Sequence, residues 1–385
     1  MNLCSIVGAR PQFVKLAAVS RALGEHANHA ILHTGQHYDS CLSGSFFDDL
    51  GIPAPDWNLE IGSGPQGLQT GRMMEGIERI LRQNAPDCVI LYGDTNSTLA
   101  GALAAVKLGI PVAHVEAGLR SFRKAMPEEV NRVLTDHVST VLFCPTTAAV
   151  ANLRREGFGR IACDGELAPM DCDLGGLQPT MDSPLVINVG DVMYDIFLRS
   201  LQRAKGESDI LAELGLQDVN FALATVHRAE NTNEPSRIRT IFEALNEVAG
   251  MHMRVVCPLH PRSRTALERL DPAAQISDLR LIPPVSYSDM LRLETNARFI
   301  VTDSGGVQKE AYFAGVPCVT VREETEWPEL VEMGWNHLVG ADRDRLLATI
   351  EELESPASNS RVSHYGDGHA ADRLVHVLLR RWGSD

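Results

Sequence analysis

The chain has 385 residues, of which 44% are hydrophobic, 22% charged and 5% aromatic, and its formal net charge at pH 7 is -15. This length exceeds what one hydrophobic core usually serves, so we expect two domains. The negative charge disfavours binding to nucleic acid, and the few aromatic residues disfavour a stacking platform for single strands. No run of about 18 apolar residues occurs, so the sequence predicts no membrane-spanning helix.

The eight cysteines, at positions 4, 41, 88, 144, 163, 172, 257 and 318, are scattered and form no CxxC pair. This pattern favours buried or incidental thiols in a reducing compartment over a metal site or a disulfide framework. The first residues, MNLCSIVGARPQFVK, lack the charged and then apolar pattern of a signal peptide. We therefore expect a cytoplasmic protein without a bound metal.

Short apolar runs alternate with segments of helical period along the chain. The runs begin with LCSIVGA, AILHTG, DCVILYGD and IPVAHVEAG and continue with LVINVGD, FALATVHR, RVVCPLHP and RFIVTDSGG. Nearly all are apolar throughout, as expected for parallel strands that are covered on both faces. Helical segments such as VKLAAVSRALGEH and PSRIRTIFEALNEVAG lie between them. This order predicts an α/β fold with right-handed crossovers.

Polar side chains gather just after the predicted strands in both halves of the chain. They are Arg10, Gln36 with His37, Asp94, Glu116, His227, His260 and Asp303 with Ser304. Ligands of doubly wound sheets bind outside the carboxyl ends of the strands. We therefore predict two Rossmann-like domains with parallel sheets that face a central cleft. The predicted domains are residues 1–185, with an acidic loop insertion at 159–184, and residues 186–365, and a final helix at 368–385 is expected to pack back on the first domain.

The segment TDSGGVQKEAYFAGVP, residues 302–317, is the strongest phosphate-binding signal. A helix that begins after Gly305 and Gly306 would offer free N–H groups and a partial positive charge to a diphosphate. Ser304 could add a hydroxyl group, and Glu310 could accept hydrogen bonds from ribose hydroxyls. The alternative is an ordinary strand-to-helix turn that Ser304 caps.

A second basic signal is GARPQFVK, residues 8–15, which differs from the GxGxxG fingerprint and so argues against bound NAD or FAD. Arg10 and Lys15 could neutralise a phosphate leaving group, or they could be solvated side chains at a helix start. His227 and His260 could donate to phosphate, and no HExxH or CxxC spacing accompanies them that would favour a metal. His114 lies within a predicted strand, where a core histidine with satisfied hydrogen bonds is the simpler interpretation.

Three carboxylates have the positions expected of groups that move protons. Asp94 and Glu116 follow buried strands, and Glu128 opens the helix of MPEEVNRVLTDH. Acidic groups beside a sugar ring are what proton abstraction and return require, especially if burial raises a pKa toward neutrality. In the alternative interpretation, Asp94 caps a helix and Glu128 pairs with Arg132 on the surface.

Seven segments in order, GARPQFVK, TGQHYD, YGDTNSTLAG, HVEAGLRS, MPEEVNR, TVHRAEN and TDSGGVQKEA, resemble the non-hydrolysing UDP-N-acetylglucosamine 2-epimerases. The resemblance covers almost the whole chain. It implies the GT-B arrangement of two Rossmann-like domains, a UDP-sugar substrate, a homodimer, and no cofactor. It also implies a mechanism, in which anti elimination of UDP gives a 2-acetamidoglucal and UDP then adds back after protonation of the other face.

The resemblance assigns roles residue by residue. Asp94, Glu116 and Glu128 match the family's catalytic carboxylates, and His227 matches its catalytic histidine. Arg10 and Lys15 match groups that assist the diphosphate, and Ser304, Gly305, Gly306 and Glu310 match the UDP-binding turn and the ribose contact. The remaining residues expected to bind the substrate are Gln36, His37, Arg132, Arg228, Asn231, His260 and Met290.

The SF…MPEE and NVGDVMYD segments also resemble the subgroup that contains UDP-2,3-diacetamido-2,3-dideoxyglucuronate 2-epimerases. An enzyme of this kind handles a carboxylate at carbon 6, for which Arg123 and Lys124 are candidates. Two other function classes stay open: a hydrolysing relative or glycosyltransferase on the same fold, and a non-catalytic UDP-sugar sensor. The presence of all three carboxylates favours proton transfer on the sugar.

Overall fold

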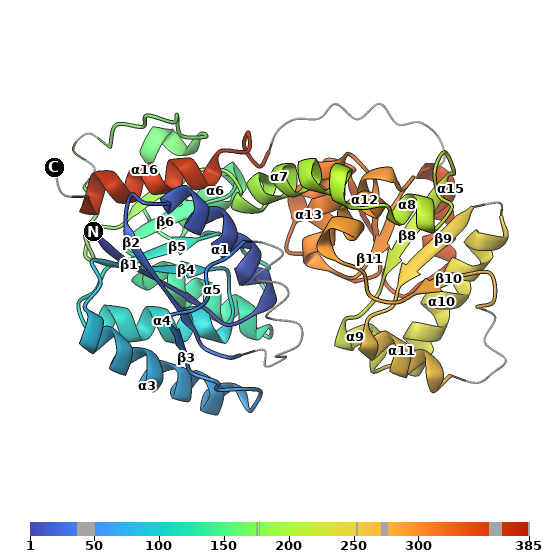
Figure 1. Cartoon of the computed structure of the whole chain (residues 1–385), viewed down its shortest axis with the longest axis horizontal. Helices are drawn as coiled ribbons and strands as arrows, with labels where there is room; N and C mark the ends of the chain where they lie inside the picture. The colour runs from blue at the N-terminus through green and yellow to red at the C-terminus, as the bar shows by residue number, and fades with distance from the viewer. Residues whose placement is uncertain are drawn as a thin grey trace. The chain divides into compact units, whose positions relative to one another are not determined.

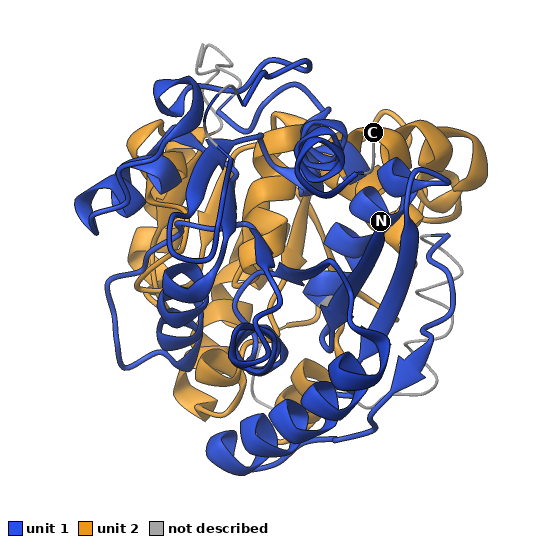
Figure 2. Ribbon diagram, turned by 90° about the vertical axis from the view of Figure 1, so that its left-hand side faces the viewer, with its two compact units in different colours: residues 1–196, 363–385 blue, residues 197–362 orange. Residues whose placement is uncertain are grey.

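The computed structural model describes residues 1–36, 51–174, 176, 178–251, 253–270, 276–353 and 364–383. The chain forms two compact units, residues 1–196 with 363–385, and residues 197–362 (Figures 1 and 2). Helix α7 (Val192–Glu207) begins in the first unit and ends in the second. Among the described residues, no helix combines the length and the apolar character needed to span a bilayer.

The first unit is built on a seven-stranded sheet with the strand order β3-β2-β1-β4-β5-β6-β7, in which all neighbours are parallel. The inner strands have few polar residues because helices cover both faces of the sheet. The strands are β1 (Asn2–Val7), β2 (Asn28–His33), β3 (Trp57–Asn58), β4 (Cys88–Tyr92), β5 (Val112–Val115), β6 (Val141–Cys144) and β7 (Leu185–Asn188).

Helices pack against the sheet of this unit, and α1 and α4 are buried along most of their length. For example, α3 and α4 pack together over β1 and β4 and bury Met73, Ile77 and Leu91. Burial of one such side chain contributes roughly 1.5–3 kcal/mol. The C-terminal helix α16 packs against α1 (Figure 1). The helices are α1 (Arg10–Leu23), α3 (Gln66–Asn84), α4 (Asn96–Lys107), α5 (Pro127–Val138), α6 (Thr147–Arg155), the short 3-10 helix η1 (Ala162–Gly165) and α16 (Ala370–Trp382).

The second unit contains a six-stranded parallel sheet with the order β10-β9-β8-β11-β12-β13. Its strands are β8 (Phe221–Thr225), β9 (Arg254–Pro258), β10 (Arg280–Ile282), β11 (Ile300–Thr302), β12 (Cys318–Thr320) and β13 (Asn336–Leu338). Its helices after α7 are α8 (Ile210–Glu213), α9 (Ala229–Thr232), α10 (Pro235–Gly250), α11 (Pro261–Glu268), α12 (Tyr287–Asn296), α13 (Gly305–Ala314), α14 (Pro328–Glu332) and α15 (Arg343–Leu353). Apolar clusters cover both faces of this sheet.

Both sheets follow the same rule of strand order. From the first strand of each unit, the chain moves outward to one edge and then returns to build the other side, which is the Rossmann order 3-2-1-4-5-6. The prediction of an α/β protein with two parallel, Rossmann-like sheets is confirmed. The order reverses between β1 and β4 in the first unit and between β8 and β11 in the second. Ligands bind at such reversal points.

The acidic segment 159–184 has many exposed residues, but contacts tie it to the rest of the first unit. Its backbone pairs with β7 at two points, through Ile161 with Val186 and through Leu167 with Asn188. Arg373 of α16 donates a hydrogen bond to the carbonyl oxygen of Ala168. The segment is therefore anchored to the edge of the sheet, by contacts whose partners lie far away in the sequence.

Candidate active site

The reversal point of the first sheet holds a buried ion pair. The Nζ atom of Lys15, on α1, lies 2.8 Å from Oε1 of Glu116, and both side chains are more than nine-tenths buried. Glu116 follows β5 and has φ of 72°, in the left-handed region that L-residues avoid. Local strain of this kind persists where the surrounding structure holds it, and it gathers at functional sites.

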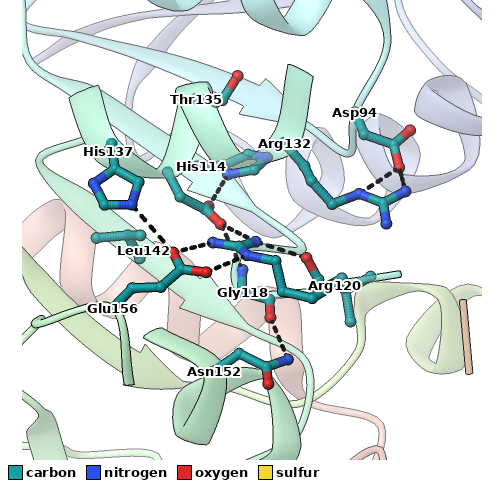
Figure 3. Close-up of polar contacts among 12 residues, drawn as sticks. Asp94, His114, Gly118, Arg120, Arg132, Thr135, His137, Leu142, Asn152 and Glu156 are labelled. Carbon is teal, nitrogen blue, oxygen red and sulfur yellow. Dashed lines mark hydrogen bonds and ion pairs between the residues drawn. The ribbon is translucent and has the colours of Figure 1, made fainter. Parts of the chain in front are cut away.

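Asp94 follows β4, and its carboxylate is held by the guanidinium group of Arg132 through the Nε and Nη2 atoms (Figure 3). Arg132, on α5, also donates to Glu129 at 3.0 Å. The cap of α4 is Thr95, whose hydroxyl accepts from the backbone N–H of Thr98, so the alternative role of Asp94 as a helix cap is wrong. Arg132 pairs with Asp94 and Glu129, and Glu128 is exposed, so the alternative of a surface pair between Glu128 and Arg132 is also wrong.

The other candidates of the first unit have different surroundings. Glu128, Arg123 and Lys124 are exposed, whereas the neighbouring Glu129 is buried and accepts hydrogen bonds from the backbone N–H groups of Ser121 and Phe122. The side-chain surroundings of Arg10 and the whole of His37 lie outside the described residues.

Gln36 follows β2 and turns toward the start of α4. Its Oε1 atom accepts from the hydroxyl group of Ser97 at 2.7 Å and from the backbone N–H of Ser97 at 3.1 Å. Gly8 lies beside this contact, because a Cβ atom there would come within 2.1 Å of the Ser97 hydroxyl. Gln36 is thus placed at the reversal point by a contact within the first unit.

In the second unit, Asp303 organises the reversal point. This fully buried carboxylate accepts from the backbone N–H groups of His227 and Arg228 and from the amide of Asn231, at 2.9 to 3.0 Å. Nδ1 of His227 lies 3.3 Å from Oδ1 of Asp303. The loop after β8 is therefore fixed by the residue that follows β11.

The imidazole ring of His227 is partly buried. Burial lowers the pKa of His227, and the neighbouring Asp303 carboxylate opposes that effect. The ring of His260 lies 5.5 Å away, centroid to centroid, so two predicted site residues come together here. A histidine with a lowered pKa is neutral at neutral pH and can accept a proton.

Helix α13 begins at the same reversal point. Ser304 is its N-cap, and the indole Nε1 of Trp327 donates to the carbonyl oxygen of Gly305 at 2.9 Å. The ammonium group of Lys309 lies 4.2 Å from the Trp327 ring centroid. The first N–H groups of a helix have no partner within it, so this terminus can bind an anion.

Glu310 lies one turn further along α13 and is buried. The phenol of Tyr287, on α12, donates to its Oε1 atom at 2.9 Å. Burial raises the pKa of Glu310 to about 7, while the Tyr287 hydrogen bond and the Lys309 charge act in the opposite direction. Met290, also on α12, packs against the apolar core of this unit.

On the prediction that the Glu310 carboxylate accepts hydrogen bonds from ribose hydroxyls, binding of uridine should weaken as the pH falls through 7. Such binding uses the ionised carboxylate, which is lost below a pKa of about 7. The affinity for uridine should drop about tenfold from pH 8 to pH 6. Titration calorimetry with uridine avoids the ionisation of the diphosphate, and Glu310→Gln should remove the dependence. Equal affinities at both pH values would contradict this role of Glu310.

Three residues of these clusters were not predicted from the sequence. Glu129 is distinguishable from Glu128 only by the register of α5. Tyr287 and Trp327 carry no motif of their own, and their partners Glu310 and Gly305 lie 23 and 22 residues away along the chain.

Comparison with known proteins places the chain in a family. The model of the family described as UDP-N-acetylglucosamine 2-epimerase matches residues 21–379. The chain is 47% identical over 382 residues to a UDP-N-acetylglucosamine 2-epimerase homolog of Methanococcus maripaludis, covering 98% of this chain and 99% of that protein. It is 46% identical over 382 residues to the UDP-2,3-diacetamido-2,3-dideoxy-D-glucuronate 2-epimerase of Pseudomonas aeruginosa, covering 99% and 100%.

Solved structures agree with this similarity. The crystal structure of the UDP-GlcNAc 2-epimerase of Methanocaldococcus jannaschii in complex with UDP-GlcNAc and UDP matches with a TM-score of 0.84 and 39% identity, over 99% of this chain and 100% of that one. The enzyme of Neisseria meningitidis bound to UDP-GlcNAc matches with a TM-score of 0.84 and 28% identity, over 99% and 100%.

Proposed function

Because the chain belongs to the UDP-N-acetylglucosamine 2-epimerase family, we propose that it is an isomerase that inverts carbon 2 of a UDP-linked 2-acetamido sugar. The observation that carries this proposal is the pair of carboxylates, Asp94 and Glu116, that follow neighbouring strands of the first sheet. The buried Arg132 side chain holds Asp94, and the buried Lys15 side chain holds Glu116. Two oriented carboxylates are suited to proton removal from one face of a carbon and proton delivery to the other.

The proposed reaction is an elimination followed by an addition. One carboxylate takes the proton from carbon 2, the bond from carbon 1 to the UDP oxygen breaks, and a carbon–carbon double bond forms. UDP then adds back to carbon 1 while a proton is delivered to the opposite face of carbon 2. Lys15 and Arg10 are proposed to assist the departing diphosphate through their charge, and His227 is proposed to act as a catalytic residue through a hydrogen bond to it.

The second unit is proposed to bind UDP. The start of α13, with Ser304, Gly305 and Gly306, suits the diphosphate, and Glu310 suits the ribose. The same proposal gives Glu128 a catalytic role. It also gives a supporting role in substrate binding to six further residues: Gln36, His37, Arg228, Asn231, His260 and Met290.

The test is a proton NMR time course in D2O with UDP-N-acetylglucosamine. Deuterium at carbon 2 together with growth of UDP-N-acetylmannosamine would support the proposal. Release of free UDP and free sugar would point to a hydrolysing enzyme instead. If neither this substrate nor the diacetamido-uronate nucleotide reacted or exchanged, the proposal would be wrong.

A second candidate substrate is the diacetamido-uronate, on which the Pseudomonas aeruginosa relative is named to act. Arg123 and Lys124 are exposed in the loop before α5, where either could reach a carboxylate. A hydrogen bond from a charged group contributes about 1.5–3 kcal/mol. We expect Arg123→Ala or Lys124→Ala to lower kcat/KM for the uronate about tenfold or more, and for the neutral sugar less than threefold.

Parallel kinetics on the two nucleotide sugars measure this selectivity. Arg72→Ala, which removes an exposed arginine on α3, is the matched control and should leave both values unchanged. Equal losses on both sugars would argue against carboxylate recognition by these residues.

We propose that the protein is a homodimer that forms through α5. Val130 and Leu134 lie one turn apart on this helix and are 40% and 45% exposed, and the nearby Phe122 is 70% exposed. Contiguous exposed apolar side chains are typical of protein interfaces. The protein is also proposed to be cytoplasmic, since the cysteines in the described part of the chain are free thiols.

Leu134→Arg is expected to convert the dimer to a monomer, because a charge would be buried without a partner in the contact. Sedimentation velocity measures the mass. Met251→Arg, at a 50% exposed apolar residue of the second unit, is the control and should stay dimeric. A monomeric wild-type protein, or a dimeric Leu134→Arg variant, would contradict this interface.

A further inference from the structure

A chain of hydrogen-bonded charged groups runs from His114 through Asp136 and Arg120 to Glu156 (Figure 3). His114, on β5, contacts Asp136, on α5, with 2.7 Å between Nδ1 and Oδ1. Asp136 accepts from Arg120 at 2.7 Å, and Arg120 makes two further hydrogen bonds of 2.7 Å to Glu156. The side chains of His114 and Asp136 have no exposed surface, and that of Arg120 is 1% exposed.

The hydrogen bonds of His114 define its protonation. Nδ1 faces the Asp136 carboxylate, and Nε2 lies 2.7 Å from the carbonyl oxygen of Gly93. A carbonyl oxygen only accepts, so Nε2 must carry a proton. Arg120 and the N–H of Gly118 both donate to Oδ2 of Asp136, so Oδ1 is left to His114 and one proton lies between Oδ1 and Nδ1. The adjacent guanidinium group of Arg120 stabilises Asp136 as an anion, which favours the position of that proton on Nδ1.

The network holds the two turns that carry the carboxylates. Gly93 directly precedes Asp94, and Gly118 lies two residues after Glu116. Glu116 has φ of 72°, a conformation that an L-residue keeps only where surrounding contacts hold it. His114 holds the first turn through the Gly93 carbonyl, and Asp136 holds the second through the Gly118 N–H.

We propose that His114 is a positioning residue, held as a doubly protonated imidazolium between Asp136 and the Gly93 carbonyl, which fixes Asp94 relative to Glu116 for proton transfer. This inference rests on the proposed function for its kinetic consequence only. Within the network, the buried Asp136 faces His114 and Arg120. Arg120 also pairs with Glu156, whose side chain is 27% exposed and also contacts His137. Each buried charge is therefore paired and hydrogen-bonded, as burial requires.

The protonation is measured by proton–nitrogen NMR of the histidine rings at pH 7, on wild-type protein labelled with nitrogen-15. We expect His114 to show two protonated ring nitrogens. His29 is the internal control, because burial lowers its pKa to about 4 and its ring is neutral at pH 7. A bare nitrogen in the His114 ring would overturn the imidazolium. The signal is assigned by its loss in His114→Gln or, if that variant does not fold, by its contacts with the protons of Asp136.

The positioning role is measured in His114→Gln, with His29→Gln as the control. Misplacement of a reacting group by about 1 Å can cost 10²-fold in rate, so we expect kcat to fall about 10- to 100-fold. KM and the Kd of UDP should change less than about twofold. An unchanged kcat would overturn the role.

A failure of the proposed function can be told apart from a failure of this inference. If the wild-type protein turned over neither sugar nucleotide, the proposed function would be wrong. The crystal structure of His114→Gln would then decide the positioning. A displaced Asp94 carboxylate would support the inference, and an unmoved one would overturn it.

Discussion

Glu116→Gln is expected to lower kcat for epimerisation by about 10²- to 10⁴-fold, and Asp94→Asn by a similar factor. Positioned acids and bases contribute rate factors of that size, and an amide of the same shape cannot take or give the proton. Lys15 would lose its buried partner in the first variant, which is expected to lower the free energy of unfolding by about 3–5 kcal/mol. Activity should therefore be measured well below the melting temperature.

The measurement is deuterium incorporation at carbon 2 together with product formation. In one informative outcome, a variant incorporates deuterium into the starting epimer and forms no second epimer. Such a variant retains the base that acts on one face of carbon 2 and lacks the acid that acts on the opposite face. Glu78→Gln, at a partly exposed helix pair with Arg82, is the control. If both Asp94→Asn and Glu116→Gln kept kcat within threefold of wild type, these residues would not be the catalytic carboxylates.

UDP binding is expected to weaken about 10- to 100-fold in Gly305→Ala and in Gly306→Ala, while folding stays intact. A Cβ atom at Gly305 would lie 3.4 Å from Oε2 of Glu326, and one at Gly306 would lie 3.8 Å from the Ser304 hydroxyl. The free protein therefore has room for either methyl group. A diphosphate that approaches the N–H groups at the start of α13 would clash with the added methyl group and lose a hydrogen bond. A hydrogen bond to a charged group contributes about 1.5–3 kcal/mol, which corresponds to the expected loss of affinity.

Titration calorimetry with UDP measures the affinity, and thermal unfolding measures stability, which should be unchanged or slightly higher in both variants. Gly250→Ala is the matched control, since the glycine ends helix α10 of the same unit and has open space around it. Wild-type affinity in both variants would place the diphosphate elsewhere.

The fold could be predicted because its signals are local. Continuous apolar runs such as DCVILYGD mark covered parallel strands, and Asp94 and Glu116 were found because they directly follow such runs. Partners were harder to predict, since they depend on the sheet order. Lys15 meets Glu116 across 101 residues, and His227 meets Asp303 across 76. No local pattern encodes these pairs.

Choices between adjacent residues could not be predicted either. The register of α5 buries Glu129, at 3% exposure, and leaves Glu128 outside. Both residues favour a helix start equally well. Buried polar clusters such as that of Tyr287 and Glu310 form only when two helices pack together, which composition and period do not specify.

The left-handed backbone of Glu116 and its ion pair act in opposite directions on the stability of the fold. An L-residue there costs roughly 1–2 kcal/mol compared with glycine. Glu116→Gly would remove that cost, but it would leave the buried ammonium group of Lys15 without its partner, at a cost of about 3–5 kcal/mol. Glycine is therefore the less stable choice, and protein engineers who raise the melting temperature of this chain can keep the carboxylate at position 116 without a trade-off.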